Sequence, residues 1–255
     1  MNATSRISAS GLVKRFGSFT AVDNVDIEIG GSGITALIGP NGAGKTTLFN
    51  LITGQLAPDD GRVVLGGTDV TGQPAHAMAR RGIGRSFQNV RLFGDMTVLE
   101  NVAVYAQPEI ASSILAMSLR PMRRNQILRE ALEQAGDVLN YLGIAHLRDM
   151  RSASLGFAQQ KLVAIARLLA LRPHILFLDE PASGLDPVGR DTLSQTIERL
   201  ASDGYAVCFV EHNTHLVRAL ATRVLFLSHG RVLADGTPDA VFSDPQLAEA
   251  YLGLV

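Results

Sequence analysis

The sequence predicts an α/β fold built on a mostly parallel sheet, and three observations support this class. Short apolar runs alternate with helical patterns along much of the chain, as parallel sheets with crossover helices require. A glycine-rich loop at residues 39–46 lies between one apolar run and a helical pattern. Apolar residues make up 46% of the 255 residues, which is typical of a globular protein with a core of its own.

The N-terminal part of the chain is rich in β-branched residues with partial alternation, which predicts strands. We expect these strands at residues 7–16, 21–29, 34–38, 62–65 and 82–87. A helix over 45–53, ended by Gly54, and a short helix over 75–81 lie among them. The run at 34–38 is wholly apolar, as a strand buried on both faces would be.

A helical block follows. Thr97 fits a helix N-cap, and Glu100 three residues later completes the pattern of a capping box. Helices are predicted over 125–142 and 158–171. We therefore expect residues 88–171 to form a helical subdomain, inserted into a core domain made of 1–87 and 172–255.

The C-terminal part returns to alternation, which indicates that the parallel sheet continues there. Strands are expected at 174–178, 205–210, 223–227 and 230–234, with helices at 188–201 and 214–221 and two short helices within 237–252.

Charge and composition exclude several classes of protein. The formal net charge of −1 gives no basic footprint for nucleic acid, so we expect no nucleic-acid partner. The single cysteine, Cys208, cannot form an internal disulfide, which favours a reducing compartment. No apolar run reaches the length of about 18 residues that a membrane span needs.

The loop at 39–46 matches the pattern G-x-x-x-x-G-K-[ST], whose glycines let backbone N–H groups surround phosphate oxygens at a helix N-terminus. Lys45 would reach the β- and γ-phosphates, and the Thr46 hydroxyl would bind Mg²⁺. The predicted nucleotide-binding residues of this segment are Gly39, Asn41, Gly42, Ala43, Gly44, Lys45, Thr46 and Thr47.

Two carboxylates end the apolar run at 174–178. Asp179 fits the acid that holds Mg²⁺ through water in phosphate-loop enzymes. Glu180, one residue further, is placed to orient or deprotonate an attacking water. The alternative is a buried strand that simply ends in a solvated turn.

Together these residues resemble the ATP-binding cassette ATPases, the motor subunits of ABC transporters. The resemblance implies a phosphate-loop, RecA-like nucleotide-binding domain with an antiparallel β subdomain and an inserted helical subdomain. It also implies roles for four more residues. Gln88 would reach Mg²⁺, Phe16 would stack on adenine, His212 would contact the γ-phosphate, and Asp186 would lie in a loop that crosses a dimer interface.

The chain departs from the family's Leu-Ser-Gly-Gly-Gln signature, which binds the nucleotide held by the opposite subunit. Here the segment reads Leu155-Gly156-Phe157-Ala158-Gln159. The serine hydroxyl is lost at Gly156, and a hydrogen bond to a charged group contributes about 1.5–3 kcal/mol. We therefore expect Gly156 and Gln159 to form the weaker of two ATP sites, unless helix dipole and backbone N–H groups suffice.

Within the family, the segments that follow the phosphate loop and the C-terminal tail are similar to the larger ATPase of branched-chain amino acid importers. The resemblance implies ATP and Mg²⁺ as cofactors, a second ATPase subunit in a heterodimer or homodimer, two permease subunits, and indirectly a periplasmic or extracellular solute-binding protein. It implies a peripheral position on the cytoplasmic face of the membrane.

Three alternatives remain open. One is the ATPase of a related urea or amide importer. Another is a regulatory nucleotide switch with weak hydrolysis, which the altered signature favours and the presence of Glu180 and His212 disfavours. The third is a soluble ABC ATPase acting on DNA or ribosomes, which the near-neutral charge disfavours.

Overall fold

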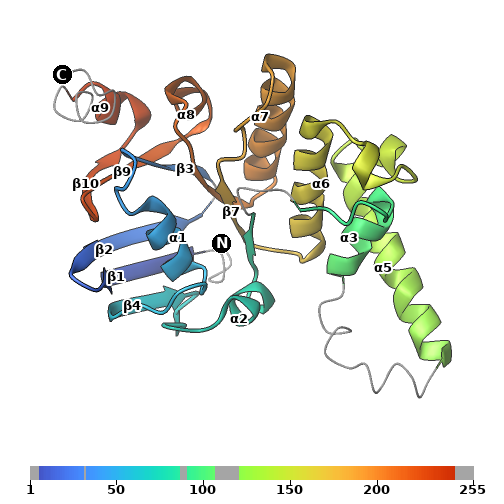
Figure 1. The fold of residues 1–255 in the computed structure, drawn as a ribbon, viewed down its shortest axis with the longest axis horizontal. Coiled ribbons are helices and arrows are strands. Elements are labelled where there is room, and N and C mark those ends of the chain that lie inside the picture. The colour runs from blue at the N-terminus through green and yellow to red at the C-terminus, as the bar shows by residue number, and fades with distance from the viewer. Residues whose placement is uncertain (1–5, 32, 87–90, 107–120, 245–255) are drawn as a thin grey trace. The chain divides into compact units, whose positions relative to one another are not determined.

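The computed structural model describes residues 6–31, 33–86, 91–106 and 121–244, and the chain divides into two compact units (Figure 1). The first, here called the core unit, comprises Met1–Arg85, His174–Ser183 and Ser194–Val255. The second, the helical unit, comprises Ser86–Pro173 and Gly184–Leu193.

The core unit contains two sheets. The antiparallel sheet has the order β2-β1-β4-β5 and consists of β1 (Arg6–Phe16), β2 (Phe19–Gly30), β4 (Asp60–Leu65) and β5 (Thr68–Asp69). The larger sheet has the order β10-β9-β3-β8-β7-β6. Its strands are β3 (Gly33–Ile38), β6 (Ile83–Arg85), β7 (Ile175–Asp179), β8 (Ala206–Val210), β9 (Arg223–Ser228) and β10 (Arg231–Gly236).

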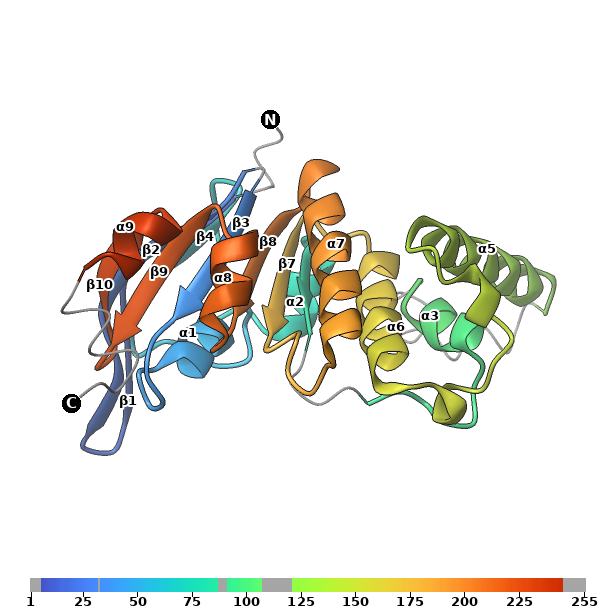
Figure 2. The same ribbon diagram turned by 90° about the horizontal axis from the view of Figure 1, so that it is seen from above.

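All pairs from β9 to β6 are parallel, whereas β10 pairs with β9 in the antiparallel direction (Figure 2). The predicted α/β fold with an antiparallel β subdomain and a helical insertion is confirmed. The two-residue strand β5 was not predicted, because Thr68 and Asp69 are too few for any alternation to appear.

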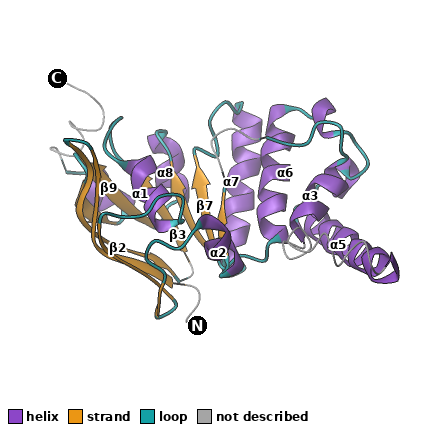
Figure 3. Cartoon of the chain, turned by 60° about the horizontal axis from the view of Figure 1, so that its bottom comes forward, coloured by secondary structure: helices purple, strands orange, loops and turns teal. Residues whose placement is uncertain are grey.

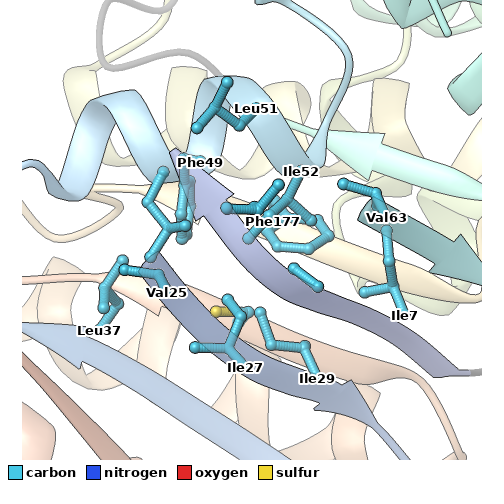
Figure 4. Close-up of a cluster of buried hydrophobic side chains, with 14 of the residues drawn as sticks. Ile7, Val25, Ile27, Ile29, Leu37, Phe49, Leu51, Ile52, Val63 and Phe177 are labelled. Atoms are coloured by element: carbon cyan, nitrogen blue, oxygen red, sulfur yellow. The ribbon is translucent and has the colours of Figure 1, made fainter. Parts of the chain in front are cut away.

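Helix α1 (Lys45–Ile52) contributes to a core cluster that includes side chains from both sheets (Figure 4). Ile7, Ile27 and Val63 come from the antiparallel sheet, and Leu37 from the parallel one. Phe49 of α1 and Phe177 of β7 meet edge to face with their ring centroids 5.2 Å apart. Both rings are fully buried, so this contact joins the helix that follows the phosphate loop to β7 of the large sheet.

The parallel strands are buried on both faces, which explains why they read as continuous apolar runs. All five residues of β8 and the first four of β7 are buried. The remaining helices that hold core-unit residues are α2 (Ala75–Arg80), α7 (Pro187–Ser202), α8 (Thr214–Leu220) and α9 (Pro238–Phe242).

The described part of the helical unit contains helices and loops but no strand (Figure 3). Its main helices are α3 (Val98–Ala106), α5 (Pro121–Tyr141) and α6 (Phe157–Ala170). The predicted capping box is confirmed, since the Thr97 N–H donates to Glu100 Oε2 at 2.8 Å and the Glu100 N–H donates to Thr97 Oγ1 at 3.1 Å. Buried Asn101 donates to Ser152 Oγ at 2.8 Å and so joins α3 to the segment before α6.

Residues 184–193 lie in the helical unit, whereas the sequence placed them in the core. The reason is close packing of two glycines against the start of α6. A Cβ on Gly184 would lie 2.8 Å from the Phe157 ring, and one on Gly189 would lie 3.1 Å from the Ala158 Cβ.

Helix α5 begins at Pro121, four residues before the predicted start at 125. The last predicted helix, in the part of 237–252 beyond Asp244, lies outside the described residues. No helix within the described ranges is long and apolar enough to cross a membrane.

Replacing Phe177 by Ala should lower the free energy of unfolding by about 3–5 kcal/mol, because it leaves a cavity against Phe49 in a fully buried core. Urea denaturation measures the effect. Phe19→Ala is the matched control, since that ring is 60% exposed and its loss should cost less than about 1 kcal/mol. Equal losses for the two variants would contradict the assigned core.

Candidate functional site

The candidate site lies at the carboxyl ends of the parallel strands of the large sheet. Strands β3, β8 and β7 run parallel, so their carboxyl ends lie at the same edge. The phosphate loop follows β3, Glu180 follows β7, and Glu211 and His212 follow β8. Three segments far apart in the sequence are thereby brought together within the core unit.

The phosphate loop depends on glycine at two tight positions. Gly39 has φ +148°, and a Cβ there would overlap the Leu227 carbonyl oxygen. Gly44 has φ +103°, and its Cβ would overlap the Ala21 carbonyl oxygen. A Cβ on Gly42, at φ +78°, would instead point into open space. The loop is therefore fixed to the sheets at its two ends and open at its tip.

Helix α1 starts directly from this loop and has no side-chain N-cap. Its first-turn N–H groups and dipole therefore face the loop, which is the arrangement that binds anions at helix N-termini. Asn41 and Thr46 are exposed at this end, Thr47 is half-buried, and Ala43 of the loop is buried.

Lys45 is the buried cation of the loop, with 7% of its surface exposed. Its Nζ donates to the carbonyl oxygens of Gly39 at 2.8 Å and Pro40 at 2.9 Å. Burial lowers the pKa of Lys45, whereas the nearby charges of Glu180 and Asp179 act to raise it. The two carboxylates at the end of β7 are thus close enough to act on the charge of Lys45.

Asp179 is buried beside a second cation, Arg85, which the sequence did not single out. Arg85 Nη2 lies 3.8 Å from Asp179 Oδ2, and both side chains are about nine-tenths buried. Arg85 Nη1 also donates to Thr53 Oγ1 at 2.6 Å, just after α1 ends. Burial lowers the pKa of Arg85 and the Asp179 charge opposes that shift. In the sequence, Arg85 lies inside the predicted strand at 82–87, and only its partners in the structure reveal its place beside Asp179.

Glu180 and His212 form a contact at the open end of β7 and β8. The Glu180 Oε1 and His212 Nε2 atoms are 3.2 Å apart. Glu180 has φ +45°, and its N–H donates to the Val210 carbonyl oxygen at 3.0 Å. The Glu180 carboxylate therefore already contacts the His212 imidazole. The unusual backbone conformation of Glu180 sets the direction of its side chain.

These residues fit a magnesium nucleotide. Loop N–H groups, an uncapped helix and a buried lysine suit phosphate oxygens. Thr46 and Asp179 supply the oxygen atoms that Mg²⁺ prefers. Among the described residues, no three His, Cys, Asp or Glu side chains gather into a group that could hold a metal ion alone. Such a site suits a cation that takes its remaining ligands from phosphate and water.

Two further predicted residues are Gln88 and Phe16. Gln88 lies outside the described residues. Phe16, at the end of β1, is 49% exposed, and the Lys14 Nζ lies 5.9 Å from the centre of its ring. An exposed ring with a cation on one face leaves its other face available for stacking.

The signature segment belongs to the helical unit. Gly156 is the N-cap of α6, with φ −64°, and its N–H donates to Gln159 Oε1 at 3.0 Å. A Cβ on Gly156 would meet only that oxygen, at 3.8 Å. Asp186 Oδ1 accepts from the Gly189 N–H at 2.8 Å and so closes the first turn of α7. Within the chain, both residues have structural partners of their own.

Comparison with known proteins decides the family. The model of the family described as "ABC transporter" matches residues 22–183. This chain belongs to the ABC transporter family. The family assignment and the site together make the protein a nucleotide-binding, ATP-hydrolysing one.

Several relatives of this ABC protein match over nearly their whole length. A high-affinity branched-chain amino acid transport ATP-binding protein, BraF of Pseudomonas aeruginosa, is 38% identical over 248 residues, 97% of each chain. LivG of Escherichia coli, with the same description, is 36% identical over the same share. The lipopolysaccharide export system ATP-binding protein LptB of Haemophilus influenzae is 32% identical over 247 residues, again 97% of each chain.

Among solved structures, an ATP-binding cassette of an ABC transporter in its ADP conformation superposes with a TM-score of 0.84 and 31% identity. The match covers 98% of this chain and 99% of that one. A nucleotide-free cassette gives a TM-score of 0.83 and 30% identity, covering 97% and 98%.

Replacing Gly39 by Ala should weaken nucleotide binding at least tenfold, because the new Cβ would push the loop away from the Leu227 carbonyl. Titration with a fluorescent ATP analogue measures this. Gly204→Ala is the matched control: it also has positive φ, at +94°, but open space around it. That variant should lose stability only. The same loss of affinity in both variants would contradict the fit of the loop.

Proposed function

We propose that this protein is the ATP-hydrolysing subunit of an importer for branched-chain amino acids. The observation that carries the proposal is the 36–38% identity, over 97% of each chain, to two proteins described as branched-chain amino acid transport ATP-binding proteins. Sites for ATP occur throughout the ABC family, whatever the transported solute. The proposed solute therefore rests on the full-length similarity and not on the ATP site.

The proposed hydrolysis relies on positioning and charge, as phosphoryl transfer generally does. Lys45 and the N–H groups from Gly39 to Thr47 hold the phosphates. Thr46 and Gln88 would hold Mg²⁺, with Asp179 acting through water, and the ion would supply positive charge to neutralise the phosphates. Phe16 stacks on the adenine.

Glu180 accepts the proton of the attacking water, and His212 contacts the γ-phosphate. The 3.2 Å contact between their side chains supports this pairing, because it holds the carboxylate beside a group that can orient it. Asp186 and the segment from Gly156 to Gln159 act on the nucleotide held by the opposite subunit.

The proposed assembly contains a second ATPase subunit, either different or identical, and two membrane permease subunits. A solute-binding protein outside the membrane delivers the amino acid. We place this chain at the cytoplasmic face, bound to the permeases, because the family couples ATP hydrolysis to membrane subunits.

A second candidate function is export, because LptB of H. influenzae is 32% identical over 97% of both chains. Import of urea or short amides is a third. An uptake experiment separates import of branched-chain amino acids from import of urea, and export predicts that neither uptake depends on this chain.

Uptake of labelled leucine, isoleucine, valine and urea should be measured in a strain that lacks this chain. The intact chain should restore uptake of the three amino acids, and Lys45→Ala should not, because the loop loses its buried cation. Arg62→Ala, which removes a cation from an exposed ion pair, is the matched control and should restore uptake. If only urea uptake, or no uptake at all, depends on the chain, the proposed solute is wrong.

Replacing Gly156 by Ser should increase ATP turnover of the assembled complex several-fold, because a hydroxyl would be restored at the opposing γ-phosphate. The space is open and the backbone suits an N-cap serine, so the fold should become slightly more stable. Gly136→Ser, also in open space, should leave turnover unchanged. Unchanged turnover in Gly156→Ser would mean that backbone N–H groups already suffice.

A further inference from the structure

Glu211 is a buried carboxylate for which the proposed mechanism has no role. It follows β8 directly, precedes His212, and is only 4% exposed. A carboxylate at such depth is costly unless several hydrogen bonds hold its charged form. In the sequence, nothing distinguishes it from an ordinary polar residue at the end of a strand.

The hydrogen bonds of Glu211 connect two loops. Its Oε1 accepts from the Ala182 N–H at 2.9 Å, in the turn after β7. Its Oε2 accepts from the His212 N–H at 3.3 Å, in its own loop. Burial raises the pKa of Glu211, whereas the N–H groups of Ala182, His212 and Asn213 lower it. One side chain thus gathers backbone donors from both loops that carry the proposed catalytic pair.

The turn after β7 needs such support. Glu180 has φ +45°, a conformation that strains a residue with a Cβ and persists only where neighbours enforce it. The Glu180 N–H donates to the carbonyl oxygen of Val210 at the end of β8, and within the turn the Ser183 N–H donates to the Glu180 carbonyl oxygen at 3.2 Å. The bond from Ala182 to Glu211 lies between these two and fixes the turn to the neighbouring loop.

We propose that Glu211 is a positioning residue that holds the turn after β7 and the loop after β8 in one arrangement, so that Glu180 and His212 remain in contact. The proposal rests on the proposed roles of Glu180 and His212 in hydrolysis. Glu211 is not itself the base, because its oxygens are buried and accept backbone N–H groups. It acts on the reaction only through the two residues that it aligns.

Two substitutions test whether Glu211 positions Glu180 and His212. Both are made in the full chain within its assembled complex. Glu211→Gln replaces one acceptor oxygen by an NH₂ group, which cannot accept from a backbone N–H. Glu211→Asp keeps the charge and the bonds within its own loop, but is one methylene too short to reach Ala182. Both variants should lower kcat at least tenfold and leave the KM for ATP within about twofold, because the phosphate loop is untouched.

Thr222→Val is the matched control. The Thr222 hydroxyl also bonds the backbone of a neighbouring strand, at Ile34, but at the opposite edge of the sheet. It should lower the thermal midpoint without lowering kcat. An unchanged kcat in Glu211→Asp, or equal losses of kcat and ATP affinity, would overturn the proposal.

Glu180→Gln separates this inference from the proposed function. That variant should bind ATP without hydrolysing it. If Glu180→Gln is inactive and both Glu211 variants turn over normally, only the positioning role is wrong. If Glu180→Gln hydrolyses ATP normally, the proposed base is wrong, and the positioning role fails with it.

Discussion

The parallel register of β3, β8 and β7 is the constraint on which the rest of the core unit depends. It brings the phosphate loop, the carboxylates of Asp179 and Glu180, and the loop of His212 to one edge of the sheet. The edge-to-face contact of Phe49 with Phe177 fixes α1 against the same sheet. A shift of β7 by one residue would turn Asp179 to the other face, away from its present partners.

The site concentrates opposite charges in a partly buried place, and each has a fixed partner. Lys45 is held by carbonyl oxygens, Asp179 lies beside Arg85, and Glu180 lies beside His212. Fixed partners of this kind hold each charged group in place before a nucleotide binds. The segment from Gly156 to Gln159 belongs to the helical unit, where its helix cap and the packing of Phe157 on Gly184 hold it.

The sequence predicted most of the fold because periodicity and the glycine-rich loop are local signals. It also predicted the residues of the phosphate loop and Glu180, which follow apolar runs, whereas His212 was expected only from the resemblance to the ABC family. It did not reveal Arg85 and Glu211, whose importance comes from partners far away in sequence, at Asp179 and Ala182. It placed 184–193 with the core because nothing local reveals that Gly184 packs on Phe157.

Hydrogen–deuterium exchange with a non-hydrolysable ATP analogue and Mg²⁺ tests most directly whether three separate strand ends form one nucleotide site. We predict that backbone N–H groups at residues 39–47, 180–183 and 211–213 become protected together, at the same analogue concentration. Protection confined to 39–47, or protection of the three segments at different concentrations, would contradict a single site.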